Sequence, residues 1–401
     1  MRHPWRIRLL LFPALFVVAC ALTPSTPAPV TRVLLPPPWT PTLSEPTPIE
    51  TGTPAPIETA TLAPAGPMLA FAGARDGHSH VIAVDLTTGS VSQLTTGSTD
   101  HGSVSWFPDG EHLLYSESDG DSESIWITDR GGRSSTEVAS GDHQSYVLPV
   151  LSPDGFQVAF FSTRDGHWAI FLMPARGGPQ HAITDNTVFE GNLSWAPDGS
   201  AIAFTPWRNT ESPPFIGIAF PSGEDFSVLF SGPQWNSNPR WSPDGERIAF
   251  RCDVGNLPQI CTIRPDGSDL RQLTSGPGGN LDAAWSPDSQ QIAFVSWRDS
   301  ARPATCEDGD CDFEVYVMAA DGSNQLNLSH HPAEDWGPTW SPDGASIAFV
   351  SLRDEPMHPS QCGDTCNSEI YVMDSLGDNA RRITQNTEPD WNPVWRPIPS
   401  P

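Results

Sequence analysis

The chain has 401 residues, a length that fits either two average domains or one large all-β unit. Its 43 Pro, 33 Gly and 15 Trp, with 37% hydrophobic residues, indicate a turn-rich β protein with a substantial core. Every basic side chain is Arg, and 21 basic against 48 acidic residues give a net charge of −27. This charge repels phosphate groups, so neither nucleic acid nor an anionic membrane surface is an expected partner of the folded part.

Residues 1–19 have the features of an export signal. Arg2, Arg6 and Arg8 precede an apolar stretch that is too short to span a bilayer. The stretch ends at Ala19-Cys20, which resembles the lipobox of bacterial lipoproteins, in which the Cys is lipidated and becomes the mature N-terminus. An ordinary secretory signal or an uncleaved anchor is the alternative. We expect lipidation at Cys20 and attachment to the extracytoplasmic side of the bacterial cell envelope, in the periplasm or at the cell surface.

Residues 20–66 are rich in Pro and Thr and include Pro36-Pro37-Pro38. Such a segment has too little apolar content to stabilise a fold, so it predicts a disordered, extended linker. A linker of this kind holds a folded domain away from the membrane. We therefore expect the folded domain to occupy residues 67–397, followed by a short tail, 398–401.

A repeated unit fills residues 67–397. Its anchor is a Trp, or Leu in one unit, that mostly precedes Ser-Pro-Asp-Gly. The anchors lie 45, 44, 46, 44, 55 and 55 residues apart, at Trp106, Leu151, Trp195, Trp241, Trp285, Trp340 and Trp395. This period is typical of one four-stranded blade of a β-propeller.

Each unit contains the same short apolar runs. After Trp340 come the turn Pro342-Asp343-Gly344 and the runs 347–350, 370–373 and 382–384. Runs of β-branched and aromatic residues bounded by Gly, Pro and Asp predict strands. We expect the Ser of the turn to cap it, and the anchor Trp to end the innermost strand and pack between blades.

The two ends of the repeat region complete each other. Residues 68–95 supply three strands without a preceding Trp, and residues 390–395 supply a first strand with nothing after it. Joining them closes the ring and removes exposed strand edges. The sequence therefore predicts an all-β propeller of seven four-stranded blades, one of them split between the two ends; six blades is the alternative.

The recurring Trp-Ser-Pro-Asp-Gly, Ile-Ala-Phe-x-Ser and Ile-Tyr-Val-Met patterns resemble the WD40-like Pro-Asp repeats of TolB-type propellers. The same repeat is found in the propellers of tricorn and prolyl-oligopeptidase-type proteases. The resemblance covers residues 68–397 and implies a scaffold that binds protein partners through its faces and central channel. We expect no counterpart of the α/β domain that precedes the propeller in TolB, so the resemblance does not carry the Tol-Pal role over.

Known catalytic arrangements are not evident. The sequence contains no Gly-x-Ser-x-Gly, no His-Glu-x-x-His, and no residues outside the repeats that would build a hydrolase domain. We therefore expect a protein without enzyme activity and without a cofactor.

Six Cys follow Cys20, and they fall in couples between the second and third strands of three units. Pairing within each couple is attractive, although six thiols allow fifteen pairings and Cys362 with Cys366 also has the spacing of half a zinc site. Disulfides agree with export to an oxidising compartment. The predicted disulfide residues are Cys252, Cys261, Cys306, Cys311, Cys362 and Cys366.

Two acidic loops have the composition of calcium ligands without the spacing of a known calcium loop. One is 119–123, and the other carries Asp308, Asp310 and Asp312. Solvated acidic turns are the simpler interpretation, and calcium at the second loop is a weak alternative to the absence of a metal.

The residue five positions before each anchor is polar, and it lies where the innermost strand begins. We expect these residues to form a ring at one mouth of the central channel and to bind a protein or peptide of the envelope or the extracellular space, with a monomeric propeller as the scaffold. One alternative is a small-ligand or carbohydrate sensor that uses Trp336 and Trp391 for stacking. Another is a propeller lyase or hydrolase that uses the carboxylates of the ring, and a third is a purely structural role. The predicted site residues are His101, Tyr146, Glu190, Asn236, Asn280, Asp335, Trp336, Asp390 and Trp391.

Overall fold

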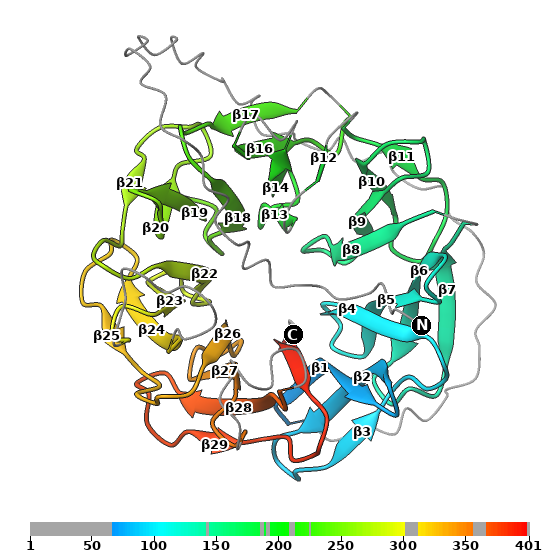
Figure 1. Cartoon of the computed structure of the whole chain (residues 1–401). Coiled ribbons are helices and arrows are strands. Elements are labelled where there is room, and N and C mark those ends of the chain that lie inside the picture. Colours follow the sequence, from blue (N-terminus) through cyan, green and yellow to red (C-terminus); the bar gives the residue numbers. More distant parts are fainter. Residues whose placement is uncertain are drawn as a thin grey trace, which may run out of the picture.

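A computed structural model of the chain describes residues 66–141, 144–184, 188–189, 193–207, 213–223, 226–300, 312–355 and 366–398. These residues form short strands joined by turns, and the strands are grouped into sheets around a central axis (Figure 1). In this part of the chain, no helix is long and apolar enough to cross a membrane. The predicted signal, Cys20 and the linker up to residue 65 lie outside the described residues.

Seven four-stranded antiparallel sheets form the blades, which we number I to VII. Each of the following blades is given from the axis outwards. Blade I contains β30 (Asp390–Trp395), β1 (Met68–Arg75), β2 (His78–Asp85) and β3 (Val91–Gln93). Blade II contains β4 (Asp100–Trp106), β5 (His112–Ser118), β6 (Glu123–Asp129) and β7 (Ser135–Ala139). Blade III contains β8 (Tyr146–Leu151), β9 (Gln157–Ser162), β10 (Ala169–Pro174) and β11 (His181–Ala182).

The remaining blades follow the same order. Blade IV contains β13 (Ser194–Trp195), β14 (Ile202–Phe204), β16 (Ile216–Ala219) and β17 (Ser227–Phe230), beside a two-stranded pair of β12 (Val188–Phe189) and β15 (Pro206–Trp207). Blade V contains β18 (Asn236–Trp241), β19 (Ile248–Val254), β20 (Leu257–Ile263) and β21 (Arg271–Gln272). Blade VI contains β22 (Asn280–Trp285), β23 (Gln291–Ser296), β24 (Glu314–Ala319) and β25 (Leu326–Asn327). Blade VII contains β26 (Asp335–Trp340), β27 (Ser346–Ser351), β28 (Glu369–Asp374) and β29 (Arg381–Arg382).

Blade I is built from both ends of the repeat region. Strand β30 pairs antiparallel with β1, with Leu69 opposite Trp395 and Gly73 opposite Asp390. In Figure 1 the red strand β30 lies beside the blue strand β1. The predicted split blade and the count of seven are confirmed, and the six-bladed alternative is wrong.

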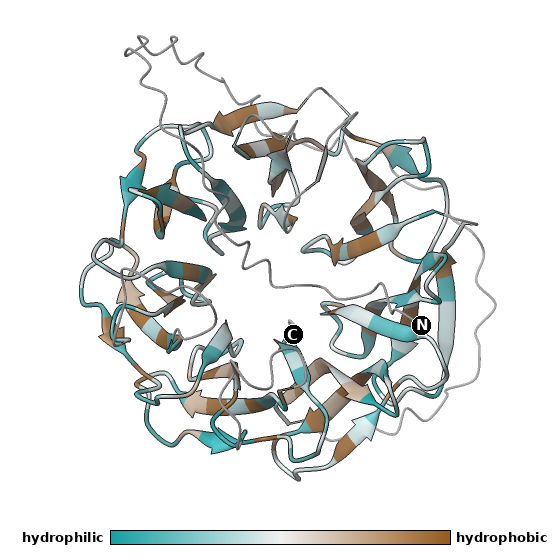
Figure 2. Ribbon diagram, in the orientation of Figure 1, coloured by the Kyte–Doolittle hydropathy of each residue, from teal (hydrophilic) through white to brown (hydrophobic). Residues whose placement is uncertain are grey.

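The core lies between the blades. The second strand of most blades carries an Ala-Phe or Leu-Tyr pair whose two side chains point to opposite faces of the sheet, because side chains alternate along a strand. Phe250, Phe294 and Phe349 are fully buried in this way. The hydrophobic residues accordingly concentrate in the middle strands of the blades (Figure 2). Each blade is therefore buried on both faces by its neighbours.

The anchor Trp side chains connect adjacent blades by hydrogen bonds. In five of the six Trp anchors, all but Trp241, the indole N–H donates to the backbone carbonyl of the residue just before the anchor of the preceding blade. The Nε1–O distances are 3.3 Å for Trp106, 3.3 Å for Trp195, 3.1 Å for Trp285, 3.1 Å for Trp340 and 3.0 Å for Trp395. The anchor therefore adds a directional contact to the apolar packing that the sequence predicts.

The Ser-Pro-Asp-Gly segments form the predicted turns. Ser242 Oγ donates to Asp244 Oδ1 at 2.6 Å, and the same contact recurs at Ser341 and Asp343. The glycine that follows is left-handed, with φ of 75° at Gly245. These turns lie at the end of the propeller where the innermost strands finish, which we call the lower face; the innermost strands begin at the upper face.

One predicted disulfide lies wholly within the described residues. Cys252 on β19 and Cys261 on β20 are bonded, with their Cα atoms 5.8 Å apart. Cys366 is also disulfide-bonded. Cys306, Cys311 and Cys362 lie outside the described residues.

Candidate functional site

The structure brings six of the predicted polar residues to the upper face, at or next to the first residue of an innermost strand. Their side chains are buried: all six are between 0% and 3% exposed, namely His101, Tyr146, Asn236, Asn280, Asp335 and Asp390. Glu190 lies outside the described residues. These side chains therefore contact neighbouring strands of the propeller, and their role in binding a partner stays a prediction.

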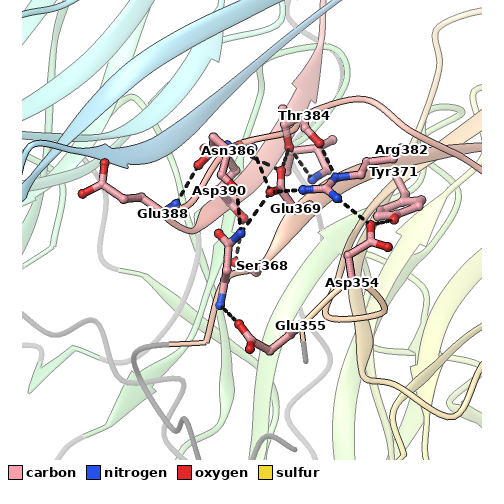
Figure 3. Close-up of polar contacts among 12 residues, drawn as sticks. Asp354, Glu355, Ser368, Glu369, Tyr371, Arg382, Thr384, Asn386, Glu388 and Asp390 are labelled. Carbon is pink, nitrogen blue, oxygen red and sulfur yellow. Dashed lines mark hydrogen bonds and ion pairs between the residues drawn. The ribbon is translucent and has the colours of Figure 1, made fainter. Parts of the chain in front are cut away.

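A polar cluster between blades VII and I shows how such a residue is held (Figure 3). The Nδ2 atom of Asn386 donates to Asp390 Oδ2 at 2.7 Å. Arg75 Nη1 lies 2.8 Å from Asp390 Oδ1. Glu369, fully buried at the start of β28, accepts hydrogen bonds from Arg382 Nη2 and Thr384 Oγ1, both at 2.5 Å. The cluster therefore contains two buried carboxylates and two arginines, and it fixes the closing strand β30 to blade VII.

In blades VI and VII, an arginine near the upper face is stacked over two neighbouring aromatic rings. The guanidinium of Arg353 lies over the rings of Phe349 and Tyr371, 5.2 and 4.6 Å from their centroids, and it donates to Asp335 Oδ2 at 2.8 Å. The Tyr371 hydroxyl donates to Asp354, and burial raises the pKa of this tyrosine. Stacking of a planar guanidinium on aromatic rings is characteristic of Arg and is lost with Lys.

In blades II and III, the predicted site residues have other partners. His101 packs against the rings of His80 and Tyr115, and its Nε2 atom lies 3.3 Å from Glu117. Burial lowers the pKa of His101 and His80, so both imidazoles are neutral near pH 7. The backbone N–H of Tyr146 donates to the buried Glu123 at 3.1 Å, and burial raises the pKa of that carboxyl.

The two predicted Trp differ in their contacts with apolar side chains. Both are half-buried, at the second position of β26 and β30. Trp336 packs against Val295 and Trp297 of blade VI and against Leu352 of blade VII. Trp391 belongs to none of the apolar clusters among the described residues. Trp391 is therefore the aromatic side chain of this face that is best placed to contact a partner.

A ring of left-handed residues was missed in the sequence. The residue three positions before each anchor has a positive φ, between 48° and 61°, in six blades. A β-bulge lies there, because two residues of the innermost strand face one of the next strand. The signal was visible as Asn, Asp or Gly at one register, since these residues tolerate this conformation best. The residues are Ser103, Leu148, Asn238, Asp282, Gly337 and Asn392.

The acidic loops show no assembled metal site in the part of the chain that the structure describes. Asp119 Oδ1 accepts the N–H groups of Asp121 and Ser122 at 2.9 and 2.8 Å, as a turn-capping carboxylate does. Asp308 and Asp310 lie outside the described residues, so calcium at Asp312 stays untested.

Comparisons with known proteins give distant relatives. No family model matches the chain. It is 28% identical over 263 residues to an uncharacterized protein of Agrobacterium fabrum, covering 61% of this chain and 82% of that protein. It is 35% identical over 79 residues to the Tol-Pal system protein TolB of Thioalkalivibrio sulfidiphilus, which covers 20% of this chain and 16% of that protein.

Solved structures share the fold at low sequence identity. TolB from Acinetobacter baumannii has a TM-score of 0.51 and 18% identity, covering 80% of this chain and 79% of that one. An oligogalacturonate lyase from Vibrio parahaemolyticus has a TM-score of 0.55 and 14% identity, covering 79% and 84%. A puromycin-hydrolyzing peptidase of Mycobacterium tuberculosis has a TM-score of 0.59 and 16% identity, covering 82% and 55%.

The exclusion of enzyme activity from the sequence was wrong. It depended on missing hydrolase motifs, but propellers of this fold occur in a lyase as well as in peptidases. A lyase needs neither a nucleophile elbow nor a second domain, so the missing motifs do not exclude catalysis.

Proposed function

Because the chain is a TolB-type β-propeller, we propose that it is a binding scaffold of the bacterial cell envelope. In this proposal the upper face, where the innermost strands begin, takes a protein or peptide segment of an envelope or extracellular partner. The TolB relatives support the envelope location and a protein partner at this coarse level.

The main support is the contrast between a buried, hydrogen-bonded residue and the half-buried Trp that follows it in the same strand. Asp390 is fully buried and held by Arg75 and Asn386, and the next residue is Trp391. A rigid support lowers the entropy lost when a side chain becomes part of an interface. Trp is also enriched among the residues that dominate binding energies. These two properties together favour Trp391 as an anchor for a partner.

The charges of the upper face favour a basic partner. Its arginines are largely engaged within the propeller: Arg75 pairs with Asp390, Arg353 with Asp335, and Arg382 with Glu369. Carboxylates at the rim, such as Asp76 and Asp100, are exposed. Complementary charge speeds the encounter of two proteins and selects against partners of like charge.

The test compares Trp391→Ala with Leu376→Ala in the full chain. Leu376 is 75% exposed between β28 and β29 on the lower face, so it controls for the loss of an exposed apolar group. Purified proteins capture partners from an envelope extract after cross-linking, and mass spectrometry measures recovery. We expect Trp391→Ala to lower the affinity about 30-fold, since an anchor residue contributes about 2 kcal/mol.

Two outcomes would contradict the proposal. One is equal recovery with Trp391→Ala and the unmodified chain; the other is an equal loss with Leu376→Ala. If the unmodified chain binds glycans on an array and Trp391→Ala does not, this face is assigned to a carbohydrate instead.

Lipid attachment at Cys20 completes the proposal, because it would hold the propeller at a membrane. We expect the unmodified chain in the membrane fraction and Cys20→Ser in the soluble fraction. Metabolic labelling with an alkyne fatty acid provides the direct readout, and labelling of Cys20→Ser would contradict the assignment.

A further inference from the structure

We call the contact between two adjacent blades a seam. Three neighbouring seams contain polar residues at equivalent positions, but these residues carry different charges. One blade contributes the first residue of its innermost strand and an arginine at or just after the end of its second strand. The preceding blade contributes a residue at or near the start of its third strand. A Ser or Thr from the end of the preceding blade completes the seam. This repetition allows each seam to serve as a reference for the others.

The seam between blades V and VI contains amides. Asn280 Nδ2 donates to Gln259 Oε1 at 2.9 Å, and Thr274 Oγ1 donates to the same oxygen at 2.9 Å. Arg298 Nη2 donates to Asn280 Oδ1 at 2.5 Å. Donors and acceptors match here without any buried carboxylate.

The seam between blades VII and I contains two carboxylates and two arginines. Asp390 pairs with Arg75, and Glu369 pairs with Arg382. Asn386 donates from Nδ2 to both carboxylates, at 2.7 Å to Asp390 and 3.5 Å to Glu369. The buried charges therefore compensate each other.

The seam between blades VI and VII has two carboxylates and one arginine. Asp335 is 0% exposed and Glu314 is 8% exposed, and Arg353 pairs with Asp335. Asn327 occupies the place of Arg382, because it faces Tyr316 in β24 as Arg382 faces Tyr371 in β28. Among the described residues, two buried carboxylates therefore share one arginine. A buried, uncompensated charge is strongly unfavourable, and such a group takes up a proton instead.

The hydrogen bonds of this seam leave one position for that proton. Asp335 Oδ2 accepts from Arg353, while the buried Oδ1 atom accepts no hydrogen bond among the described residues. The hydroxyls of Ser329 and Ser351 also face this carboxyl, but Ser329 donates its proton to Glu314 Oε2 at 2.8 Å. Glu314 lies near enough to disfavour a second negative charge.

We propose that the seam between blades VI and VII is a proton-binding site, in which Asp335 holds one proton on Oδ1 and accepts from Arg353 on Oδ2, while Glu314 stays ionised beside it. Release of the proton leaves two buried carboxylates facing one arginine, which loosens the contact between the two blades.

Among the described residues, Arg353 is the only positive group that acts on Asp335. His331 donates its backbone N–H to Glu314, and burial lowers the pKa of its imidazole, which keeps the ring neutral. His330 is exposed to water. Glu334 precedes Asp335, and burial together with Asp312 raises the pKa of Glu334 to about 7. Burial likewise raises the pKa of Asp335 to about 6, against the pull of Arg353.

Infrared spectroscopy of the full chain tests the site, because a carboxylic acid has a C=O band that a carboxylate lacks. Aspartate labelled with ¹³C separates the Asp335 band from that of Glu334. We expect an acid band that disappears with a midpoint near pH 6 and is absent in Asp335→Asn, the residue found at Asn280. Glu334→Gln is the control and keeps this band.

A second variant leaves Asp335 in place. Asn327→Arg introduces the compensating charge found at Arg382, so the midpoint should fall below about pH 5, since a nearby opposite charge lowers a carboxyl pKa by one to three units. Persistence of the full labelled band in Asp335→Asn, or an unchanged midpoint in Asn327→Arg, would overturn the proposal. The readout is protonation alone, so it is independent of any partner.

Discussion

Replacing Trp285 with Phe removes the indole N–H that donates to the Arg240 carbonyl at 3.1 Å. Trp241, the anchor of the preceding blade, has the same flanking Ser-Pro-Asp and is also half-buried, but its buried Nε1 atom has no hydrogen-bond partner among the described residues. Trp285→Phe therefore breaks a contact between blades, and Trp241→Phe removes an unsatisfied donor. The pair isolates the hydrogen bond from the loss of indole packing.

The expected difference follows from these two situations. Loss of the bond at Trp285 costs about 1 kcal/mol, and more if the Arg240 carbonyl stays unpaired. Removal of the unpaired donor at Trp241 recovers about 1 kcal/mol or more of desolvation penalty. Both variants lose a similar apolar area. We expect Trp285→Phe to be less stable than Trp241→Phe by about 2 kcal/mol.

Urea denaturation followed by far-ultraviolet circular dichroism measures this difference. The midpoint should be lower for Trp285→Phe than for Trp241→Phe at an unchanged slope, since a changed slope indicates a different amount of exposed surface. Equal midpoints, or a larger loss at Trp241, would refute the assignment of the indole bond as a contact that stabilises the ring.

Three further changes test other parts of the ring. Arg396→Met removes the hydrogen bond from Nε to the Gly110 carbonyl (2.6 Å), which ties the closing strand to blade II, so the unfolding midpoint should fall by the equivalent of about 1–3 kcal/mol. Asn392→Ala should cost about 1 kcal/mol and Asn392→Gly clearly less, because φ is 54° there; equal losses would contradict this. Replacing both Cys252 and Cys261 with Ser should lower the stability measured by thermal unfolding by about 2–3 kcal/mol, and an equally stable variant would contradict this.

The fold could be predicted from the sequence because each blade repeats a local pattern. The strand runs and the turns follow from residues close together in the chain. The paired ends need one further argument, the closure of the ring, and the pairing of Leu69 with Trp395 confirms it.

The burial and the partners of the predicted site residues could not be predicted from the sequence in the same way. Asp390 pairs with Arg75, which is 315 residues away in the sequence, and Glu369 comes from a different strand of the neighbouring blade. A polar residue at a strand start therefore looked exposed, although the partners that bury it belong to other strands. The left-handed ring, in contrast, depends on residue types at one register, and Asn-Pro at 238–239 and 392–393 was visible.

The left-handed ring also limits how a partner can bind along the central axis. The innermost strand of each blade has one edge without a neighbouring strand, and such an edge ordinarily accepts an added strand. Here a bulge bends that edge, and the next residue is Pro in four blades, at Pro149, Pro239, Pro338 and Pro393. Proline has no N–H to donate, and a bulge interrupts the ladder. An extended peptide therefore cannot form a continuous ladder along these edges, and we expect a partner at the upper face, as proposed, to be recognised by side chains such as Trp391.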